Sequence, residues 1–216
     1  MRVAFFDFDH TLLCADSNQL WVDYLHAQGL IDAAALATHA GFMRDYRAGT
    51  LDFAQLDAFR GAIEADIAAT RLQSCRDDFA RRHLLPAVAP GAHALLDELR
   101  RRQVLTMVVS ASREALVRPA ANHLGFEHVL AADSNPPGAN DLPCFGAGKV
   151  LHVEAALAVL GTSLDALDRS WFYTDSHNDL PLLERVTHPV AVDPDPVLAA
   201  VARERTWPIV SLCGAA

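Results

Sequence analysis

The sequence predicts an α/β protein with a Rossmann-like parallel sheet core and a helical cap inserted after the first strand. Three observations support this fold class. An apolar run from Val3 to Phe6 opens the chain, as in a buried parallel strand. From about Asp16 to Leu85 the periodicity is helical, without strand signals. Beyond Pro86 short apolar strands alternate with helical segments, which is typical of parallel βαβ units.

Two carboxylates, Asp7 and Asp9, follow the first strand directly. Open α/β sheets bind ligands at the carboxyl ends of their strands, so we expect both side chains at a functional site. The chain turns at a strand end, which allows the two carboxylates to take separate roles. One would attack or bind a metal ion while the other transfers protons.

The helical block has breaks near Gly29, at 48–50 and at Pro86, which predicts four helices. Apolar residues at helical spacing mark the buried faces of these helices. The other expected elements are helices at 91–102, 112–124, 149–160 and 196–203, a helix ending at Val186, strands at 104–109, 126–132, 190–192, around Trp171 and at Ile209, and a loop at 133–148.

A second apolar run, at 105–109, ends at Ser110 and precedes a helical pattern. A helix N-terminus presents free N–H groups and a positive dipole to an anion. Ser110 and the adjacent N–H of Ala111 therefore lie where an anion could bind. Ser112 is a candidate N-cap of the same helix, and the two roles are compatible because they use different serines.

Lys149 opens a later helix, where its positive charge opposes the helix dipole. Such a lysine is usually a solvated surface charge, but an anionic neighbour would compensate for the unfavourable position. A further short strand ends at Asp175, and Asp179 follows four residues later. Mg²⁺ prefers oxygen ligands and accepts one or two carboxylates beside phosphate and water, so these aspartates are candidate metal ligands.

These four segments, in this order, resemble the motifs of the haloacid dehalogenase superfamily of phosphohydrolases and phosphotransferases. The resemblance implies that Asp7 attacks phosphorus and becomes phosphorylated. It implies that Asp9 protonates the leaving alcohol and then activates the water that cleaves the intermediate. It also implies that Ser110 grips a phosphoryl oxygen and that Lys149 neutralises the nucleophile and the transferring group.

The same resemblance implies a Mg²⁺ site made by Asp7, the backbone carbonyl of Asp9, and Asp175, with Asp179 binding through water or orienting the other groups. The expected reaction is hydrolysis of a small phosphate monoester through a phosphoaspartyl intermediate. Two alternatives remain open: phosphotransfer to an acceptor other than water, and non-catalytic phosphate binding by a regulatory protein. The second would be expected to lack Asp7 or Asp9, and both are present.

A helical cap after the first motif resembles the phosphoserine-phosphatase-like branch of the superfamily. Asp16 stands nine residues after Asp7, where that branch carries a glutamate that contacts the substrate amine. Arg60 stands seven residues after Phe53, where the branch carries an arginine that grips the substrate carboxylate. The alternatives are that Asp16 is a helix N-cap and Arg60 a solvated helix residue. We expect a cap domain at 15–86 and a core domain at 1–14 and 87–216.

The chain has 216 residues, 51% of them hydrophobic, and a formal net charge of −9. This charge argues against nucleic acids and anionic membranes as partners, since both attract basic surfaces. No apolar run reaches the length of a transmembrane helix, and a first strand beginning at Arg2 or Val3 leaves no room for a signal peptide. We expect a cytoplasmic protein whose partner is a small phosphorylated metabolite. The four cysteines lack C-x-x-C spacing and are expected to be reduced thiols.

Overall fold

The computed structural model describes residues 1–134 and 142–214. Within these residues six parallel strands form one sheet in the order β3-β2-β1-β4-β5-β6. The strand order reverses between β1 and β4, which makes this the switch point of a doubly wound sheet. The predicted fold class is confirmed. The strands are β1 (Arg2–Phe6), β2 (Leu105–Val109), β3 (His128–Leu130), β4 (Arg169–Thr174), β5 (His188–Val192) and β6 (Ile209–Val210).

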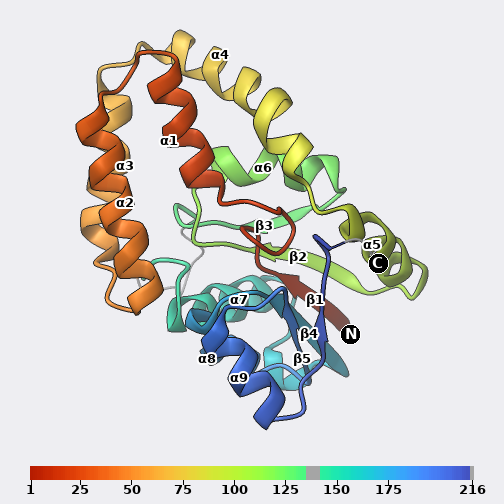
Figure 1. Ribbon diagram of the computed structural model, residues 1–216. Helices are drawn as coiled ribbons and strands as arrows, with labels where there is room; N and C mark the ends of the chain where they lie inside the picture. Colours follow the sequence, from red (N-terminus) through yellow and green to blue (C-terminus); the bar gives the residue numbers. More distant parts are fainter. Residues whose placement is uncertain (135–141, 215–216) are drawn as a thin grey trace.

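Helices cover both faces of the sheet (Figure 1). Successive residues of a strand point to opposite faces, so Phe5 and Phe6 of β1 belong to different core clusters. Phe6 packs in the cluster that includes α5 and α6, and Phe5 packs in the cluster that includes α7, α8 and α9. Burial on both sides explains why the strands read as continuous apolar runs. These helices are α5 (Pro90–Arg101), α6 (Glu114–His123), α7 (Ala147–Val159), α8 (Leu180–Leu183) and α9 (Pro196–Glu204).

Four further helices lie between β1 and β2 in the sequence and stand apart from the sheet in space (Figure 1). Three of them begin after an aspartate, Asp16, Asp32 or Asp52, whose side chain accepts a hydrogen bond from a backbone N–H of the first turn. Such N-caps each stabilise a helix by about 0.5–2 kcal/mol. In the described part of the chain, no helix is both long and apolar enough to cross a membrane. The four helices are α1 (Ser17–Ala27), α2 (Ala33–Ala48), α3 (Phe53–Ala65) and α4 (Ala69–Phe79).

The two segments that connect these helices to the sheet run side by side. Leu13 and Val88 form an isolated antiparallel bridge. The Cys14 N–H donates to the Ala87 carbonyl oxygen at 2.8 Å. The chain therefore leaves the core and returns to it at one place. This pairing supports our proposal that α1–α4 form a cap domain with its boundaries near residues 14 and 87.

The strand predicted at 126–132 is shorter in the structure. The Phe126 N–H donates to the Ala121 carbonyl oxygen of α6 at 2.9 Å, so Phe126 closes the helix and does not pair in the sheet. The strand itself spans only His128–Leu130. Residues 135–141, in the loop expected at 133–148, lie outside the described residues.

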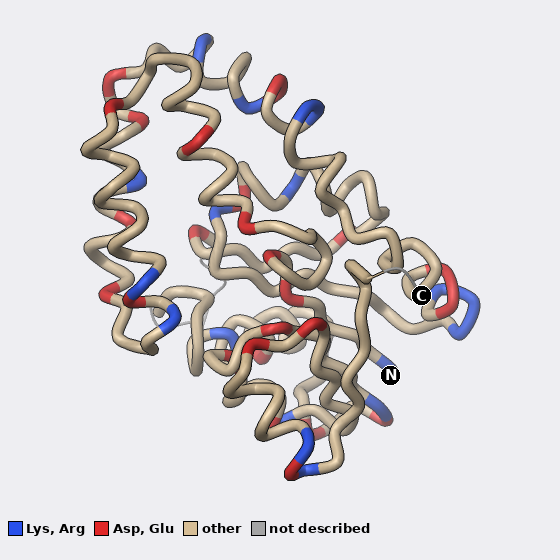
Figure 2. Tube along the Cα trace, viewed as in Figure 1, with Lys and Arg blue, Asp and Glu red and all other residues tan. Residues whose placement is uncertain are grey.

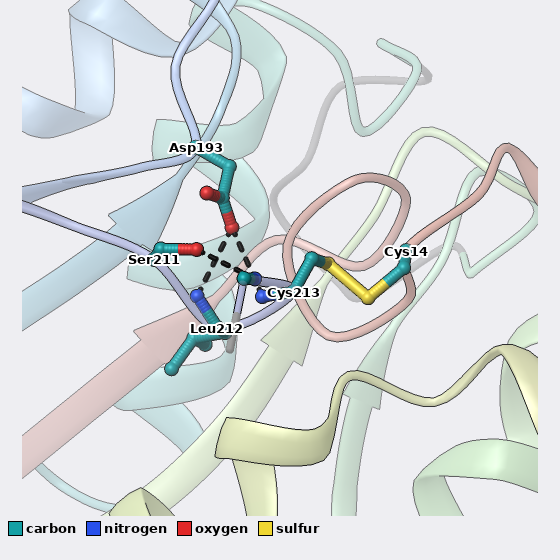
Figure 3. Close-up of a disulfide and its surroundings, with 6 residues drawn as sticks. Cys14, Asp193, Ser211, Leu212 and Cys213 are labelled. Carbon is teal, nitrogen blue, oxygen red and sulfur yellow. Dashed lines mark hydrogen bonds between the residues drawn. A yellow bond between two sulfur atoms is a disulfide. The ribbon is translucent and has the colours of Figure 1, made fainter. Parts of the chain in front are cut away.

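A disulfide joins Cys14 to Cys213, 199 residues later (Figure 3). It links the C-terminal segment to the loop after β1. The Asp193 carboxylate accepts a hydrogen bond from the Cys213 N–H at 3.2 Å and so orders the same segment. The expectation of four reduced thiols is wrong for this pair, while Cys75 and Cys144 are free and buried. Local spacing gives no sign of two cysteines that only the tertiary fold brings together.

Reduction of the Cys14–Cys213 disulfide is expected to lower the free energy of unfolding by about 2–4 kcal/mol, because the cross-link restricts the unfolded chain. Urea unfolding with and without dithiothreitol measures this difference. Cys14→Ser should have the free energy of unfolding of the reduced wild type, with and without dithiothreitol. The control variant Cys75→Ser should keep the wild-type response, and a wild type that is equally stable in both conditions would contradict the prediction.

Candidate active site

A buried lysine lies between two carboxylates at the carboxyl ends of β1 and β4. Lys149 Nζ donates to Asp7 Oδ1 and to Asp179 Oδ2, both at 2.7 Å. Burial alone would lower the pKa of Lys149, but Asp179 and Asp7 together outweigh burial and raise the pKa well above its usual value. The lysine is therefore a fixed positive charge. It is 2% exposed, so the solvated alternative is wrong.

The backbone brings these groups together. The Asp7 N–H donates to the Tyr173 carbonyl oxygen of β4 at 2.9 Å, which places the end of β1 beside the end of β4. Thr174, the last residue of β4, donates its hydroxyl to Asp179 Oδ2 at 2.7 Å. Thr174 was not among the predicted site residues. Its one sequence signal is a hydroxyl at the end of an otherwise apolar strand.

Asp175 adds negative charge to the same place. Its N–H donates to Thr11 Oγ1 at 3.1 Å, which fixes the turn after β4. Burial raises the pKa of Asp175 well above its usual value, and the neighbouring Asp7 and Asp179 raise it further. The single charge of Lys149 does not balance these carboxylates. A second cation would relieve the repulsion between them.

A magnesium ion fits this donor set. Among the described residues, no three His, Cys, Asp or Glu side chains converge as a metal cluster. Mg²⁺ does not require one, because it binds through one or two carboxylates and completes its octahedron with substrate phosphate and water. Asp7, Asp175 and the backbone carbonyl of Asp9 offer the hard oxygens it prefers. Asp179 Oδ2 is already bonded to Lys149 and Thr174, so we propose that Asp179 orients the lysine.

Ser110 follows the last residue of β2 and is buried. The Ser110 N–H donates to the Leu130 carbonyl oxygen at 2.8 Å, as part of the sheet edge. Its Oγ accepts from the Ser112 N–H at 3.0 Å, which leaves the hydroxyl proton for another acceptor. The next backbone donor is the N–H of Ala111. This arrangement supports the proposal that Ser110 and Ala111 bind phosphoryl oxygens.

Both oxygens of the Asp9 carboxylate accept hydrogen bonds. Oδ1 accepts from the Ser17 N–H at 2.6 Å and Oδ2 accepts from the Ser112 hydroxyl. Burial raises the pKa of Asp9 to about 7, and the nearby Asp16 charge contributes. A pKa close to neutrality suits a group that must both give and take a proton. The expected N-cap role of Ser112 is wrong, because Arg113 is the N-cap residue of α6 and makes no side-chain cap bond.

Two cap residues predicted to contact substrate face the same region. Asp16 is the N-cap of α1, accepting from the Gln19 N–H at 2.9 Å, and it also lines the cavity beside Asp9. Arg60 is 8% exposed, so the solvated alternative is wrong for it. Its Nη1 donates to the Ala111 carbonyl oxygen at 3.3 Å. Asp16 is therefore a helix N-cap, and its contact with substrate stays a prediction. Arg60 joins α3 to the core beside Ser110.

Two cavities meet at this site. A cavity of about 40 Å³ lies under the cap beside Asp7 and Asp9, and a cavity of about 670 Å³ lies next to it. Acidic positions gather in this region, between the cap helices and the sheet (Figure 2). The larger cavity is lined by aspartates and histidines as well as by apolar side chains. The residues that line both cavities are His10, Asp16, Met43, Tyr46 and Asp175.

Comparisons with known proteins agree with this geometry. The family model described as haloacid dehalogenase-like hydrolase matches residues 4–184. A histidinol-phosphatase of Neisseria meningitidis serogroup C is 32% identical over 97% of this chain and 98% of that protein. A crystal structure of a protein with unknown function from Bordetella pertussis Tohama I is 32% identical, with a TM-score of 0.87 and 98% coverage of both chains. A substrate-bound phosphoserine phosphatase, 15% identical with a TM-score of 0.67 over 97% of this chain and 92% of that one, shares the fold.

Asp175→Asn is expected to raise the midpoint of thermal unfolding in EDTA, because it removes one of the like charges that crowd Asp7. Relief of about 1 kcal/mol would raise the midpoint by roughly 2–4 °C at this chain length. The variant should also lose most of the stabilisation that Mg²⁺ gives the wild type. Asp165→Asn, at a side chain that is 81% exposed, is the control. Equal responses of Asp175→Asn and wild type to Mg²⁺ would contradict the proposed site.

The raised pKa of Asp175 also predicts how the stability of the protein in EDTA changes with pH. The pKa of Asp175 is higher in the folded than in the unfolded chain, so the folded state binds more protons between the two values. Stability in EDTA therefore falls as pH rises through the raised pKa. Asp175→Asn should show a smaller decline than wild type over that range.

Proposed function

We propose that this chain, which belongs to the haloacid dehalogenase-like hydrolases and is a phosphatase of that family, hydrolyses a small phosphate monoester. The reaction would pass through a phosphoaspartyl intermediate and would use Mg²⁺. The hydrogen bond of 2.7 Å between Lys149 and Asp7 carries the proposal. A carboxylate can attack an anionic phosphoryl group only where positive charge offsets their repulsion. Lys149 supplies that charge beside the nucleophile.

In the first step an oxygen of Asp7 attacks phosphorus and the bond from phosphorus to the leaving oxygen breaks. Asp9 gives a proton to the leaving alcohol. The Ser110 hydroxyl and the Ala111 N–H hold phosphoryl oxygens while Lys149 keeps Asp7 in place. Asp7, the backbone carbonyl of Asp9 and Asp175 would hold Mg²⁺, which would supply charge neutralisation for the phosphoryl group.

In the second step Asp9 takes a proton from a water molecule, which attacks phosphorus of the phosphoaspartate. The bond from phosphorus to the Asp7 oxygen breaks, inorganic phosphate leaves, and both aspartates return to their starting states. One group serves as acid and then as base, and a pKa of about 7 for Asp9 is compatible with both roles at neutral pH. Release of free phosphate with no acceptor present separates hydrolysis from phosphotransfer.

We propose that the substrate carries an amine, and histidinol phosphate is the first candidate. The Neisseria relative is named for histidinol. Histidinol phosphate has an amino group and an imidazole but no carboxylate. Asp16, Asp193 and Asp195 line the larger cavity together with Arg47, and the excess of negative charge favours a cationic group. This wall lies beside the reacting groups, where the leaving alcohol would extend.

Arg60 favours phosphoserine as a second candidate. Burial, with Arg113 nearby, lowers the pKa of Arg60 to about 10, so the guanidinium stays charged at neutral pH. Within the described residues its Nε has no hydrogen-bond partner. Arg60 also lines the small cavity. A substrate carboxylate would satisfy this donor.

The cytoplasm remains our proposed location for a phosphatase of small metabolites. The Cys14–Cys213 disulfide argues against this location and for an oxidising compartment, because cytosolic glutathione and thioredoxin keep thiols reduced. Rapid alkylation of thiols in intact cells distinguishes the two compartments. Alkylation of Cys14 and Cys213 would support the cytoplasmic proposal, and their protection would contradict it.

Asp7→Asn is expected to abolish phosphate release while the fold stays intact, because it removes the nucleophile and a metal ligand with little change in volume. Phosphate release from p-nitrophenyl phosphate, with thermal unfolding as the check on folding, measures the effect. Wild type should lose activity in EDTA and regain it with Mg²⁺. If Asp7→Asn kept more than about a hundredth of the wild-type rate, Asp7 would not be the nucleophile.

Asp16→Ala and Arg60→Lys distinguish the candidate substrates. If the amine is recognised, Asp16→Ala should lower kcat/KM for histidinol phosphate by about tenfold to a hundredfold, the usual cost of losing a hydrogen bond to a charged group. Arg60→Lys keeps the charge but loses the planar fork, so it should reduce kcat/KM for phosphoserine alone. p-Nitrophenyl phosphate has neither group and is the control. Equal losses on all three compounds would indicate a folding defect and contradict both recognition roles.

A further inference from the structure

Three polar residues, Ser17, Asn18 and Ser112, surround the Asp9 carboxylate. Ser112 is 1% exposed, Asn18 is 8% exposed and Ser17 is fully buried. Ser112 Oγ contacts Asp9 Oδ2, and Asn18 Nδ2 lies 2.7 Å from the same Ser112 oxygen. Ser17 contributes its backbone N–H to Asp9 Oδ1 at 2.6 Å and its hydroxyl to Ser112 Oγ at 3.2 Å. The proposed mechanism assigns no role to Ser112 or Asn18.

The direction of these hydrogen bonds follows from which atoms carry protons. The amide nitrogen of Asn18 can only donate, so the Ser112 oxygen accepts from it. The single hydroxyl proton of Ser112 is then free to point at the Asp9 carboxylate, which can accept it. A buried hydroxyl that accepts on one side and donates on the other has a fixed orientation. The carboxylate is held at both oxygens and has little freedom to rotate.

We propose that Ser112 is a positioning residue that holds the Asp9 carboxylate in the orientation for proton transfer, and that Asn18 acts through Ser112. The inference rests on the proposed acid–base role of Asp9. Proton transfer needs hydrogen-bond contact between Asp9 and the leaving oxygen or the attacking water. A carboxylate free to rotate would spend less time in that geometry. Ser112 would therefore raise kcat through Asp9. Because Ser112 also lines the small cavity, an unchanged KM separates this role from a direct contact with substrate.

The network also joins the two parts of the fold. Ser17 and Asn18 belong to the first turn of α1, the first helix of the cap. Ser112 follows β2 in the core and lies 94 residues from Asn18 along the chain. The acid–base group therefore receives donors from both sides of the cap boundary. Its orientation depends on the cap helix standing where the structure places it.

A double-mutant cycle tests this chain of contacts. Ser112→Ala is expected to lower kcat for histidinol phosphate by about tenfold to a hundredfold, since a hydrogen bond to a charged group is lost, while KM stays near the wild-type value. Asn18→Ala should cause a smaller loss. The double variant should be no slower than Ser112→Ala, because residues that act through one another are not additive. Midpoints of thermal unfolding for all variants identify losses that come from folding.

p-Nitrophenyl phosphate separates the two steps and needs no knowledge of the natural substrate. Its leaving group departs without a proton donor, so Ser112→Ala should keep a rapid burst of nitrophenolate. Slow turnover should follow, because water activation by Asp9 is impaired. Ser110→Ala is the matched control, since loss of a phosphoryl contact should slow the burst itself.

The outcomes are distinct. Non-additive losses in kcat together with a preserved burst support the positioning role. Unchanged kcat in Ser112→Ala, additive losses from Asn18→Ala and Ser112→Ala, or a loss confined to KM would overturn it while the phosphatase proposal stands. Absence of phosphate release by the wild type from either compound would overturn the proposed function, and this inference with it.

Discussion

The site depends on one buried cation held between two carboxylates. Lys149 cannot leave its position without stranding Asp7 and Asp179 as buried charges, and breaking such a pair typically costs about 3–5 kcal/mol. The thirteen-residue helix α7 holds the lysine in its first turn, where the helix dipole alone would disfavour it. The carboxylates therefore determine the place of the lysine, and the lysine in turn holds Asp7, the proposed nucleophile, in position. Structural stability and chemistry use the same contacts here.

The cluster of Lys149 and its carboxylates requires neighbouring strands that end at the same edge of the sheet. In a parallel sheet the carboxyl ends of neighbouring strands meet at one edge, and β1 and β4 are neighbours at the switch point. Asp7 and Asp175 each follow the last residues of these strands, and the Asp7 N–H bonds to β4 directly. An antiparallel neighbour would carry its acid to the far edge of the sheet. The excess of carboxylates over Lys149 is then a direct consequence of topology, and it supports the proposal of a metal cation at this site.

The sequence was informative where function coincides with the end of an apolar run. Asp7, Ser110 and Asp175 follow such runs, so their positions at one edge of the sheet were predictable. The misassigned residues depend on tertiary contacts. Ser112 has the local pattern of an N-cap, yet its hydroxyl bonds to a carboxylate 103 residues away. Cys14 finds its partner 199 residues away, and no local pattern encodes contacts at that distance.

The cap closes on the core through contacts of unequal strength. At the rim, the ion pair between Arg113 and Asp57 is partly exposed, and such pairs contribute about 0–1 kcal/mol. The network around Asp9 is buried, where unmade hydrogen bonds are costly. The cavity of about 40 Å³ beside Asp7 holds little more than a water molecule or two, and the adjoining cavity of about 670 Å³ offers the room for a larger group. If the proposed cap moved away, it would carry Ser17 and Asn18 with it, and Asp9 would lose these donors. Exclusion of water and alignment of the proposed acid–base group would then be completed in the same movement.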